Sequence, residues 1–406
     1  MKIILLSENF PPEVGAPQIR LYEVGKELID RGHEVEVLTA FPHHPHGIIP
    51  DEYKGKFYQF EVLDGIPVHR SWIYPSPKGS FWRRLISYFS FTFSAFFSVI
   101  KAKKTDVIIC TSPPLFLGIT GYIASKMKHA KFVFNVADIW PESAVELGIL
   151  KNKSFIKLAE RLESFLYKKS WKIATATEGI KDYMIRNGKD IEDVFLLPNG
   201  VNTVQFSPLS KNKELLNTLK LTEKKVFTFA GRMGYAQALD SVLNAAKIVQ
   251  DKGCGQISFL FVGDGPERQN LIKQANELGL ENVIFHDPVP VTKMPEIFSI
   301  THFSLVTLKN IDLFKGARPS KIFPALSTGT PVLFSGAGES VKLISENYCG
   351  VISKPEDPQD LAEKIIDCVN MSNEKYEDLS QNGREFVERE YSWKRIVDDL
   401  LVNITK

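Results

Sequence analysis

The sequence predicts an α/β protein built from two parallel-sheet domains, and three observations support this prediction. Strand and helix patterns alternate along the whole chain, which is typical of parallel sheets with helices on both faces. The chain has 406 residues, more than one domain usually holds. The alternation breaks once, at 198–210, where PNGVNTVQFSPLS is rich in Pro, Asn, Gly and Ser. We therefore place a domain boundary between residues 197 and 198.

The expected N-terminal domain, 1–197, begins with the strand KIILLS. The apolar run is too short for a signal peptide, and no small-residue cleavage site follows it. A helical pattern over 17–31 and the strand HEVEVLT come next. Three further strands are expected at 106–112, 131–138 and 172–177, and one long helix is expected at 153–170.

The second half repeats one pattern, a strand that runs into a glycine turn and then into a helix. KVFTFAGRMG (225–234) and ISFLFVGDGPE (257–267) both follow it, and the first of their helices is expected at 239–251. VIFHDPVP (283–290) and HFSLVTL (302–308) add two further strands. In such sheets ligands bind at the carboxyl ends of the strands, and we expect a ligand cleft between the two domains.

Composition narrows the functional classes. The hydrophobic content of 44% and the charged content of 24% are those of an ordinary soluble enzyme. A net charge of +2 gives no support to nucleic-acid binding. The four cysteines are scattered and form no Cys-x-x-Cys motif, so we expect free thiols in a reducing compartment.

The segment 65–105 contains no acidic residue. Within it, LISYFSFTFSAFFSVI (85–100) is uncharged, and its serines and its large apolar residues fall on opposite faces of a helix. It is slightly short for a membrane span. Two interpretations remain open: an amphipathic helix that holds 78–104 at a membrane surface, or a core helix whose hydroxyls face a cleft. The residues concerned are Ser87, Ser90, Ser94 and Ser98, opposite Ile86, Phe89, Phe93, Phe96, Phe97 and Ile100, with Trp82 and seven basic residues nearby.

Three glycine-bounded turns are candidate anion sites. Gly15 precedes a helix whose N-terminal amides can bind an anion. Arg232 lies between two glycines after a strand, where its guanidinium can pair with a phosphate. The turn VGDGPE, with Gly263 and Gly265, is of the same kind. The alternative for each is an ordinary turn without a ligand.

Taken in order, the motifs of this chain resemble those of the retaining GT-B nucleotide-sugar glycosyltransferases of family four. The nearest branch is the one that builds O-antigens and capsules, including N-acetylfucosamine transferases. The resemblance spans essentially the whole chain and is specific for fold and family rather than for the sugar. The motifs are ENFPPEVGAPQIRLYEVGKELIDRGHEVEVLT, DIWPES, LPNGVN, AGRMG, VGDGPE, RPSKIFPALSTGTPVL and EREYSWKRIVDDLL.

This resemblance implies a GT-B fold, with two Rossmann-like domains facing across a cleft. The second domain, 198–385, would hold a nucleotide-sugar donor, expected to be UDP-linked, and 386–406 would form a helix that packs back on the first domain. The implied reaction is metal-independent transfer with retention, without a further cofactor. Its acceptor would be a polyprenyl-diphosphate-linked saccharide, at the cytoplasmic face of the cell membrane.

The resemblance also assigns roles to residues. Gly15, Arg232 and Lys321 match groups at the donor diphosphate, and Asp138 matches a polar residue beside the transferred sugar. Asp138 could equally be a helix N-cap, and Glu142 is a weaker candidate for an acceptor base. The remaining matches are the base-reading loop His286, Pro288 and Val289, and the glycine turns at Gly263, Gly265, Gly336 and Gly338.

Four positions depart from the family pattern. Gln237 and Ala238 replace a phosphate lysine and a glycine, and Gly316 and Pro324 replace two glutamates, the second of which binds ribose. Three hypotheses follow: an active transferase, a weak or inactive GT-B subunit or scaffold, and a GT-B epimerase or phosphorylase.

Pro324 also bears on the local structure, because proline is tolerated in the first turn of a helix but not in its interior. We therefore expect a loop over 320–323 and a helix that starts near Pro324. Lys321 would lie on the loop ahead of that helix, where it can still reach an anion.

Overall fold

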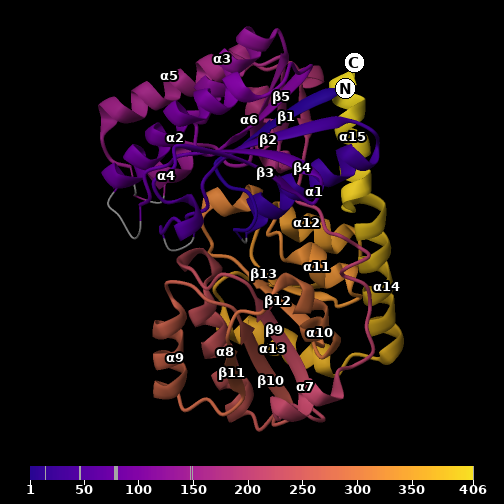
Figure 1. Cartoon of the computed structure of the whole chain (residues 1–406). Coiled ribbons are helices and arrows are strands. Elements are labelled where there is room, and N and C mark those ends of the chain that lie inside the picture. The colour runs from indigo at the N-terminus through magenta and orange to yellow at the C-terminus, as the bar shows by residue number, and fades with distance from the viewer. Residues whose placement is uncertain (14, 45–46, 77–80, 147, 149, 406) are drawn as a thin grey trace. The chain divides into compact units, whose positions relative to one another are not determined.

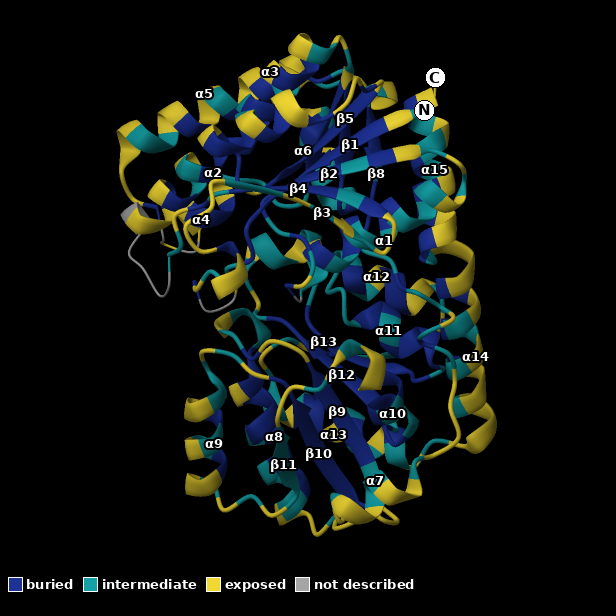
Figure 2. Cartoon of the chain, in the orientation of Figure 1, coloured by how far each residue is buried: buried dark blue, intermediate teal, exposed yellow. Residues whose placement is uncertain are grey.

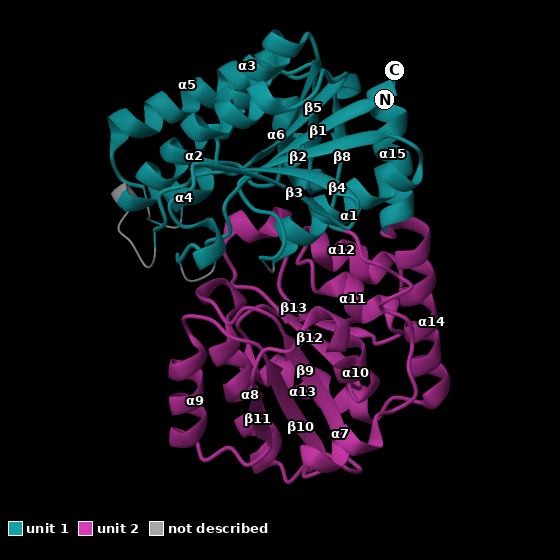
Figure 3. Cartoon of the chain, in the orientation of Figure 1, with its two compact units in different colours: residues 1–199, 393–406 teal, residues 200–392 magenta. Residues whose placement is uncertain are grey.

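The computed structural model describes residues 1–13, 15–44, 47–76, 81–146, 148 and 150–405. The chain divides into two compact units, coloured separately in Figure 3. Unit 1 consists of Met1–Asn199 and Trp393–Lys406, and unit 2 of Gly200–Ser392. Unit 1 is therefore discontinuous in sequence, because the last segment of the chain returns to the unit that the first segment begins.

Unit 1 contains an eight-stranded sheet of order β3-β4-β2-β1-β5-β6-β7-β8 (Figure 1). Every neighbouring pair is parallel except the β3–β4 hairpin. The strand order reverses between β1 and β5, which marks the expected ligand crevice of such a sheet. The strands are β1 (Lys2–Leu6), β2 (Glu34–Ala40), β3 (Tyr58–Leu63), β4 (Ile66–Ser71), β5 (Val107–Ser112), β6 (Lys131–Val136), β7 (Lys172–Thr175) and β8 (Val194–Leu196).

Helices cover both faces of this sheet, as its fully apolar central strands require. Ile3 and Leu5 of β1 pack in one apolar cluster with the C-terminal helix, whereas Ile4 and Leu6 pack in a second cluster on the other face. Figure 2 shows the strands as the most buried part of the unit. The helices are α1 (Ala16–Asp30), α2 (Phe81–Lys101), α3 (Leu117–Lys128), α4 (Glu142–Glu146), α5 (Lys153–Lys169), α6 (Glu178–Arg186) and α15 (Trp393–Thr405).

Helix α2 packs on the sheet through a face that carries its serines together with the buried residues Phe91, Ala95 and Val99. The Ser98 hydroxyl lies 2.6 Å from that of Ser71, and the Ser90 hydroxyl accepts the Tyr74 amide at 2.8 Å. Ser94 donates to the Trp72 carbonyl. The opposite face is exposed, with Phe93 at 75% and Ile100 at 65%. The hydroxyls thus bond within unit 1 rather than face a cleft, and α2 contributes one face to the core while its other face is exposed.

Unit 2 contains a six-stranded parallel sheet of order β11-β10-β9-β12-β13-β14. This order is that of a Rossmann sheet, and it reverses between β9 and β12. The strands are β9 (Lys225–Ala230), β10 (Ile257–Val262), β11 (Val283–His286), β12 (Phe303–Thr307), β13 (Val332–Ser335) and β14 (Gly350–Ser353). The helices are α7 (Lys213–Thr218), α8 (Leu239–Asp251), α9 (Arg268–Glu277), α10 (Met294–Ser299), α11 (Ile322–Ser327), α12 (Glu339–Glu346), α13 (Pro358–Val369) and α14 (Asn373–Glu390). The predicted α/β class with two parallel sheets is confirmed.

The expected loop over 320–323 is wrong. Helix α11 begins at Ile322, so Phe323 is helical and Pro324 is the third residue of the helix. A missing N–H there removes no intrahelical bond, because the first four amides of a helix have no acceptor within it. Phe323 is fully buried, and its ring stacks on Tyr391 with 4.1 Å between centroids. This packing overrides the preference of a residue before proline for extended angles.

Three further expectations concern cysteines, metal and membrane. Cys110, Cys254, Cys349 and Cys368 are all free thiols. In the described ranges, no group of three or more His, Cys, Asp or Glu side chains is arranged to hold a metal ion. None of the described helices combines the length and the apolarity needed to cross a bilayer. Residues 78–80 of the expected membrane segment lie outside the described part of the chain.

Candidate functional site

In unit 2, two glycine turns at the carboxyl ends of β9 and β10 interlock with each other and with the end of β11. The Gly231 amide donates to the Val262 carbonyl at 2.9 Å, and the Gly263 amide donates to the His286 carbonyl at 3.2 Å. Gly263 has a φ of +136°, and a Cβ there would lie 2.1 Å from the Gly231 carbonyl oxygen. Only glycine fits so close a backbone crossing. The glycines of AGRMG and VGDGPE thus build one continuous backbone surface.

Gly265 fixes the far side of the same surface. Its φ is +158°, and a Cβ there would lie 2.2 Å from the Met233 carbonyl oxygen. The Met233 amide in turn donates to the Asp264 carbonyl at 2.8 Å. The backbone on both sides of Arg232 is therefore held in place, while the Arg232 residue itself is exposed. Its guanidinium has no ion-pair or hydrogen-bond partner among the residues that the structure describes.

Lys321 lies beside this surface. Its ammonium nitrogen is 3.9 Å from the centroid of the Phe229 ring, and a Cβ built on Gly231 would lie 3.6 Å from the same nitrogen. No carboxylate of the described residues pairs with it, and burial lowers the pKa of Lys321 to about 7. The structure thus brings Arg232 and Lys321, 89 positions apart in the sequence, to one glycine turn. An anion between them would restore full charge to the lysine.

The turn before α12 completes this edge of unit 2. Gly336 is buried, and Gly338 has a φ of +83° with room for no side chain, because a Cβ would lie 2.0 Å from the Lys315 carbonyl oxygen. Arg318 is already engaged here: it pairs with Glu339 and donates to the Tyr391 hydroxyl at 2.6 Å. Arg318 is therefore structural, in contrast to Lys321 three residues later.

One position that departs from the family pattern, Gln237, has a structural role of its own. The Gln237 side-chain oxygen accepts the Gly234 amide at 3.1 Å and so closes the turn after Arg232.

In the expected base-reading loop, the His286 carbonyl accepts the Gly263 amide. Pro288 is exposed, and Val289 packs against a small apolar cluster. Among the described residues, no hydrogen bond identifies a side chain that takes over the ribose-binding role of the glutamate that Pro324 replaces.

In unit 1, Asp138 follows β6 and is largely buried. Its carboxylate accepts the Ser143 hydroxyl at 3.0 Å, and burial raises its pKa. Helix α4 begins only at Glu142, so Asp138 lies too early in the chain to cap it. Burial, with a contribution from Glu146, also raises the pKa of Glu142. Two carboxyl groups with raised pKa values thus lie four positions apart in the segment after β6.

Gly15 directly precedes α1, as expected, but its backbone does not require glycine. Its φ of 171° is an ordinary extended value. A Cβ there would meet the Gln18 side-chain oxygen at 2.5 Å. This oxygen is the end of a flexible side chain that can move away, so a larger residue at position 15 would not strain the backbone.

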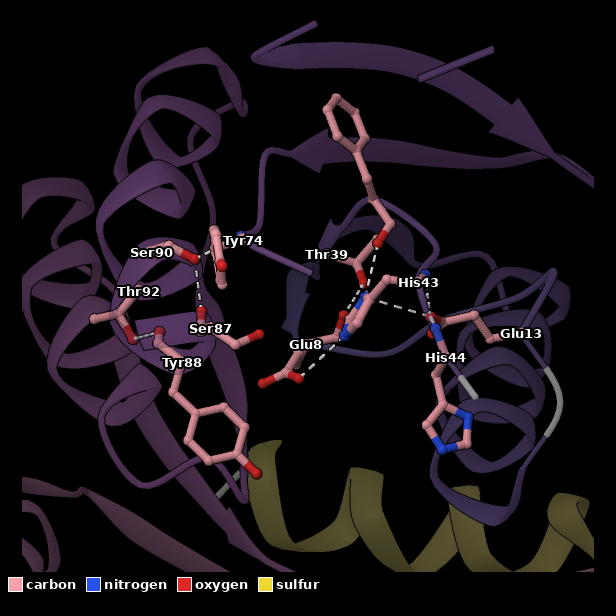
Figure 4. A network of polar contacts seen from close by, with 11 residues as sticks. Glu8, Glu13, Thr39, His43, His44, Tyr74, Ser87, Tyr88, Ser90 and Thr92 are labelled. Carbon is pink, nitrogen blue, oxygen red and sulfur yellow. Dashed lines mark hydrogen bonds and ion pairs between the residues drawn. The ribbon is translucent and has the colours of Figure 1, made fainter. Parts of the chain in front are cut away.

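Sequence reasoning missed a second polar group in unit 1, formed by Glu8, Glu13 and His43 (Figure 4). His43 lies 3.5 Å from a carboxylate oxygen of each glutamate. All three residues follow the ends of the neighbouring strands β1 and β2. The available signal was the position of SENFPPE and AFPHH directly after two apolar strands.

Comparisons with known proteins bear on both units. Residues 15–200 match the family model described as a glycosyl transferase 4-like domain, and residues 211–386 match the model of glycosyl transferases group 1. The chain is a GT-B glycosyltransferase of group 1. Relatives of this glycosyltransferase include WcaI of Escherichia coli, assigned to colanic acid biosynthesis, which is 26% identical over 86% of this chain and 87% of its own. WbjE of Pseudomonas aeruginosa, named as a glycosyltransferase, is 25% identical over 73% of this chain and 77% of its own.

Solved structures support the fold of this group 1 glycosyltransferase. HepE of Anabaena, in complex with UDP and glucose, has a TM-score of 0.73 at 17% identity and covers 100% of this chain and 99% of its own. Sucrose-phosphate synthase of Thermosynechococcus elongatus has a TM-score of 0.77 at 16% identity over 100% and 98%. At these identities the likeness concerns the fold alone.

Proposed function

We propose that this glycosyltransferase takes a sugar from a UDP-linked donor and transfers it, with retention, to a polyprenyl-diphosphate-linked saccharide. The observation that carries the proposal is the pair of unpartnered cations, Arg232 and Lys321, at the interlocked glycine turns of unit 2. The leaving group of such a reaction is a diphosphate, and fixed cations and backbone amides stabilise the charge that develops on it. Two side-chain cations at this position supply such charge without a metal ion.

The substrate classes rest on relatives and on surface chemistry. The HepE structures hold UDP and glucose in one case and UDP-glucose in another, and this supports a UDP-linked donor. The assignment of WcaI to colanic acid biosynthesis supports a role in surface polysaccharide synthesis. The transferred sugar of the nearest branch would be an N-acetylated deoxyhexosamine. The candidate residues beside it are Asp138 and Glu142, and those around the nucleotide are Gly15, Gly263, Gly265, His286, Pro288, Val289, Gly336 and Gly338.

The first experiment measures UDP affinity by calorimetry and then UDP release from a panel of UDP-sugars with lipid-linked acceptors. We expect UDP to bind the wild type and Arg232→Ala to weaken that binding. A bidentate Arg–phosphate pair is among the stronger protein contacts, so the expected loss is about tenfold to a hundredfold. The absence of UDP binding by the wild type would overturn the donor proposal.

The exposed face of α2 supports a location at a membrane. Its outward residues are apolar, and both ends of the helix are basic, with Arg83 and Arg84 at the start and Lys101, Lys103 and Lys104 at the end. An exposed apolar face with basic flanks fits the interface of an anionic bilayer. We therefore place the enzyme on the inner face of the cell membrane, where lipid-linked acceptors are found. Flotation with anionic liposomes tests this, and protein that stays in the soluble fraction at low salt would contradict it.

A second candidate function, that of a catalytically weak GT-B subunit, is favoured by the side chains at 237 and 324. Gln237 and Pro324 carry neither the positive nor the negative charge of the family pattern. Lys321 offers a cation at the same glycine turn, which favours the active enzyme. A UDP-induced rise in melting temperature that is lost in Lys321→Ala, together with UDP release in the transfer assay, would exclude the inactive subunit.

A further inference from the structure

The inference concerns the carboxyl edge of unit 1, where Glu8 and His43 follow the neighbouring parallel strands β1 and β2. Both residues emerge beside the point where the strand order of the sheet reverses. The Glu8 carbonyl accepts the Thr39 hydroxyl at 3.0 Å and the Ala40 amide at 3.2 Å. The backbone of Glu8 is thus fixed to the end of β2, and its side chain has a defined direction.

Glu13 holds the loop that carries His43. One of its carboxylate oxygens accepts the backbone amides of His43 and His44, each at 2.7 Å. The same oxygen lies 3.5 Å from Nδ1 of His43. The His43 Nδ1 is also 3.0 Å from the Phe41 carbonyl. With Nδ1 donating on this side, Nε2 points to Glu8, 3.5 Å from Oε1.

The two carboxylates beside His43 favour the protonated form of its imidazole. Burial by itself lowers its pKa, but the two carboxylates outweigh this effect, so that the pKa of His43 is raised. The His43 ring thus engages one oxygen of the Glu8 carboxylate, Oε1, and leaves the other oxygen for a different partner.

The second oxygen of Glu8 has no such partner. Glu8 is 7% exposed, and its Oε2 is buried without a hydrogen bond from any of the described residues. A buried polar oxygen without a hydrogen-bond partner destabilises a fold. Native proteins rarely retain such an oxygen except where a ligand or a water completes it. Glu8 therefore differs from Glu13, whose bonds are all explained by the fold.

Tyr88 of α2 lies close enough to Glu8 for the two side chains to interact electrostatically. Burial and the charge of Glu8 raise the pKa of Tyr88 to about 12, so the phenol stays protonated at any physiological pH. Figure 4 shows the Glu8 carboxylate between His43 and Tyr88. A carboxylate acceptor and a phenol that both donates and accepts are the groups with which proteins bind sugar hydroxyls.

We propose that Oε2 of Glu8 accepts a hydrogen bond from a hydroxyl of the acceptor saccharide, and that His43 and Glu13 position Glu8 for this contact. The inference rests on the proposed transfer reaction and adds to it an acceptor subsite in unit 1. Glu8 binds and orients the hydroxyl in this account, and no proton transfer to it is required.

The experiment uses the full chain, labelled with ¹⁵N-histidine and saturated with UDP. The His43 ring signals, assigned with His43→Gln, report on Glu8 because the two side chains are paired. The probes are methyl glycosides of glucose, galactose, N-acetylglucosamine and N-acetylfucosamine, and a short-chain polyprenyl-diphosphate N-acetylglucosamine. We expect a saturable shift with at least one probe, and in Glu8→Gln a dissociation constant for that probe about tenfold weaker or more.

Two controls separate binding from structure. Glu34→Gln changes a carboxylate at the opposite end of β2 and should leave saccharide affinity unchanged. UDP affinity should stay within about twofold in Glu8→Gln, since the loss of a hydrogen bond to UDP would weaken UDP binding by more than this. If Glu8→Gln does not fold, Glu8→Asp keeps the charge and withdraws it by one methylene, and it should weaken saccharide binding in the same way.

The outcomes are distinct from those of the donor experiment. A wild type that shows no saturable shift with any probe, or a Glu8→Gln variant with unchanged saccharide affinity, would overturn the subsite. A melting temperature that falls in Glu8→Gln while saccharide affinity is retained would assign Glu8 a purely structural role. Failure to bind UDP would instead contradict the transfer reaction itself.

Discussion

The carboxyl edges of the two sheets carry opposite charges, although the strand order reverses in both. In unit 2, the unpartnered groups at this edge are the cations Arg232 and Lys321. In unit 1 the unpartnered group is a carboxylate oxygen, Oε2 of Glu8, and a second carboxylate, Asp138, accepts the Ser143 hydroxyl. The backbone of this fold thus determines where a ligand binds, and the side chains at that edge determine which kind of ligand it is.

The difference extends to how each edge is built. Unit 2 relies on glycines at 231, 263 and 265 that bring backbone to backbone. Unit 1 relies on side chains, with Glu13 holding His43 and His43 holding Glu8. Close backbone approach suits a diphosphate, which amides can surround. A hydroxyl requires only one or two oriented acceptors. This difference is consistent with the proposed donor side in unit 2 and acceptor side in unit 1. Four predictions test the contrast between the two units.

The largest effect is expected from removing the buried cation of unit 2. Lys321→Ala should lower transfer by about a hundredfold to a thousandfold, because it deletes a preorganised charge at the leaving group. UDP affinity should fall together with the rate, since the diphosphate is bound in both states. The measurements are steady-state UDP release and calorimetry.

The matched control for Lys321 is Lys293. This lysine is exposed, and it pairs with Glu296 at 2.6 Å, so Lys293→Ala should leave transfer unchanged. If Lys321→Ala kept full activity, the proposal that the edge of unit 2 acts through its cations would lose its main support.

The second prediction concerns the outer face of unit 1. Replacing Phe93 and Ile100 of α2 by serine should reduce binding to anionic liposomes by about tenfold to a hundredfold, because two apolar side chains that are each about half withdrawn from water together contribute about 1.5–3 kcal/mol. The fold should be unaffected, as Phe93 is 75% and Ile100 65% exposed. Val204→Ser in unit 2, at a residue that is 85% exposed, is the control. Unchanged flotation of the double variant would remove the basis of the membrane proposal.

The third prediction uses the pKa of Lys321, which burial lowers to about 7. UDP binds the ammonium form and raises its pKa, so the free enzyme loses the binding-competent charge as the pH rises above 7. UDP affinity should therefore fall by about tenfold per pH unit, until the pKa of the complex is reached. Calorimetry in buffers of different ionisation enthalpy should show proton uptake on binding.

Lys321→Arg separates this effect from the ionisation of UDP, because a guanidinium stays charged at these pH values. Its affinity profile should lack the decline above pH 7. A wild-type profile that coincides with that of the arginine variant would mean that Lys321 does not contact the diphosphate.

The smallest effect is expected at Pro324. Pro324→Glu adds a carboxylate to the first turn of α11, where the helix dipole favours it. UDP should bind about twofold to tenfold more tightly, the value of one added hydrogen bond. Pro324→Ala removes the ring without adding a charge and serves as the control. Equal UDP affinity in both variants would show that ribose recognition here does not depend on this position.

Periodicity and turn residues were sufficient to predict most of the fold. The helix expected at 239–251 is α8, and the strands around AGRMG and VGDGPE form where glycine turns end them. The start of α11 was predicted wrongly because local proline rules carry no information about the burial of Phe323. The faces of α2 could be read from the sequence, but their orientation could not. The serines of this helix bond to Ser71 at the end of β4 and to the residues that follow it, and these partners are set by the tertiary fold.

The candidate site was predictable only in part, for a similar reason. Arg232 and the glycine turns are local motifs that a single segment reveals. The closeness of Lys321 to Gly231 and the pairing of Glu8 with His43 join segments that are far apart along the chain. Such contacts depend on sheet order, which no local pattern encodes.

The discontinuous course of unit 1 bears on how the protein is made. Trp393, Ile396, Val397, Leu400 and Ile404 of α15 belong to the same apolar cluster as Ile3 and Leu5. During synthesis, the ribosome releases the whole of unit 2 before these residues emerge. The half of the molecule that is translated first is therefore completed last. Until then, the nascent chain exposes an unfinished apolar face of unit 1, at which chaperones can act.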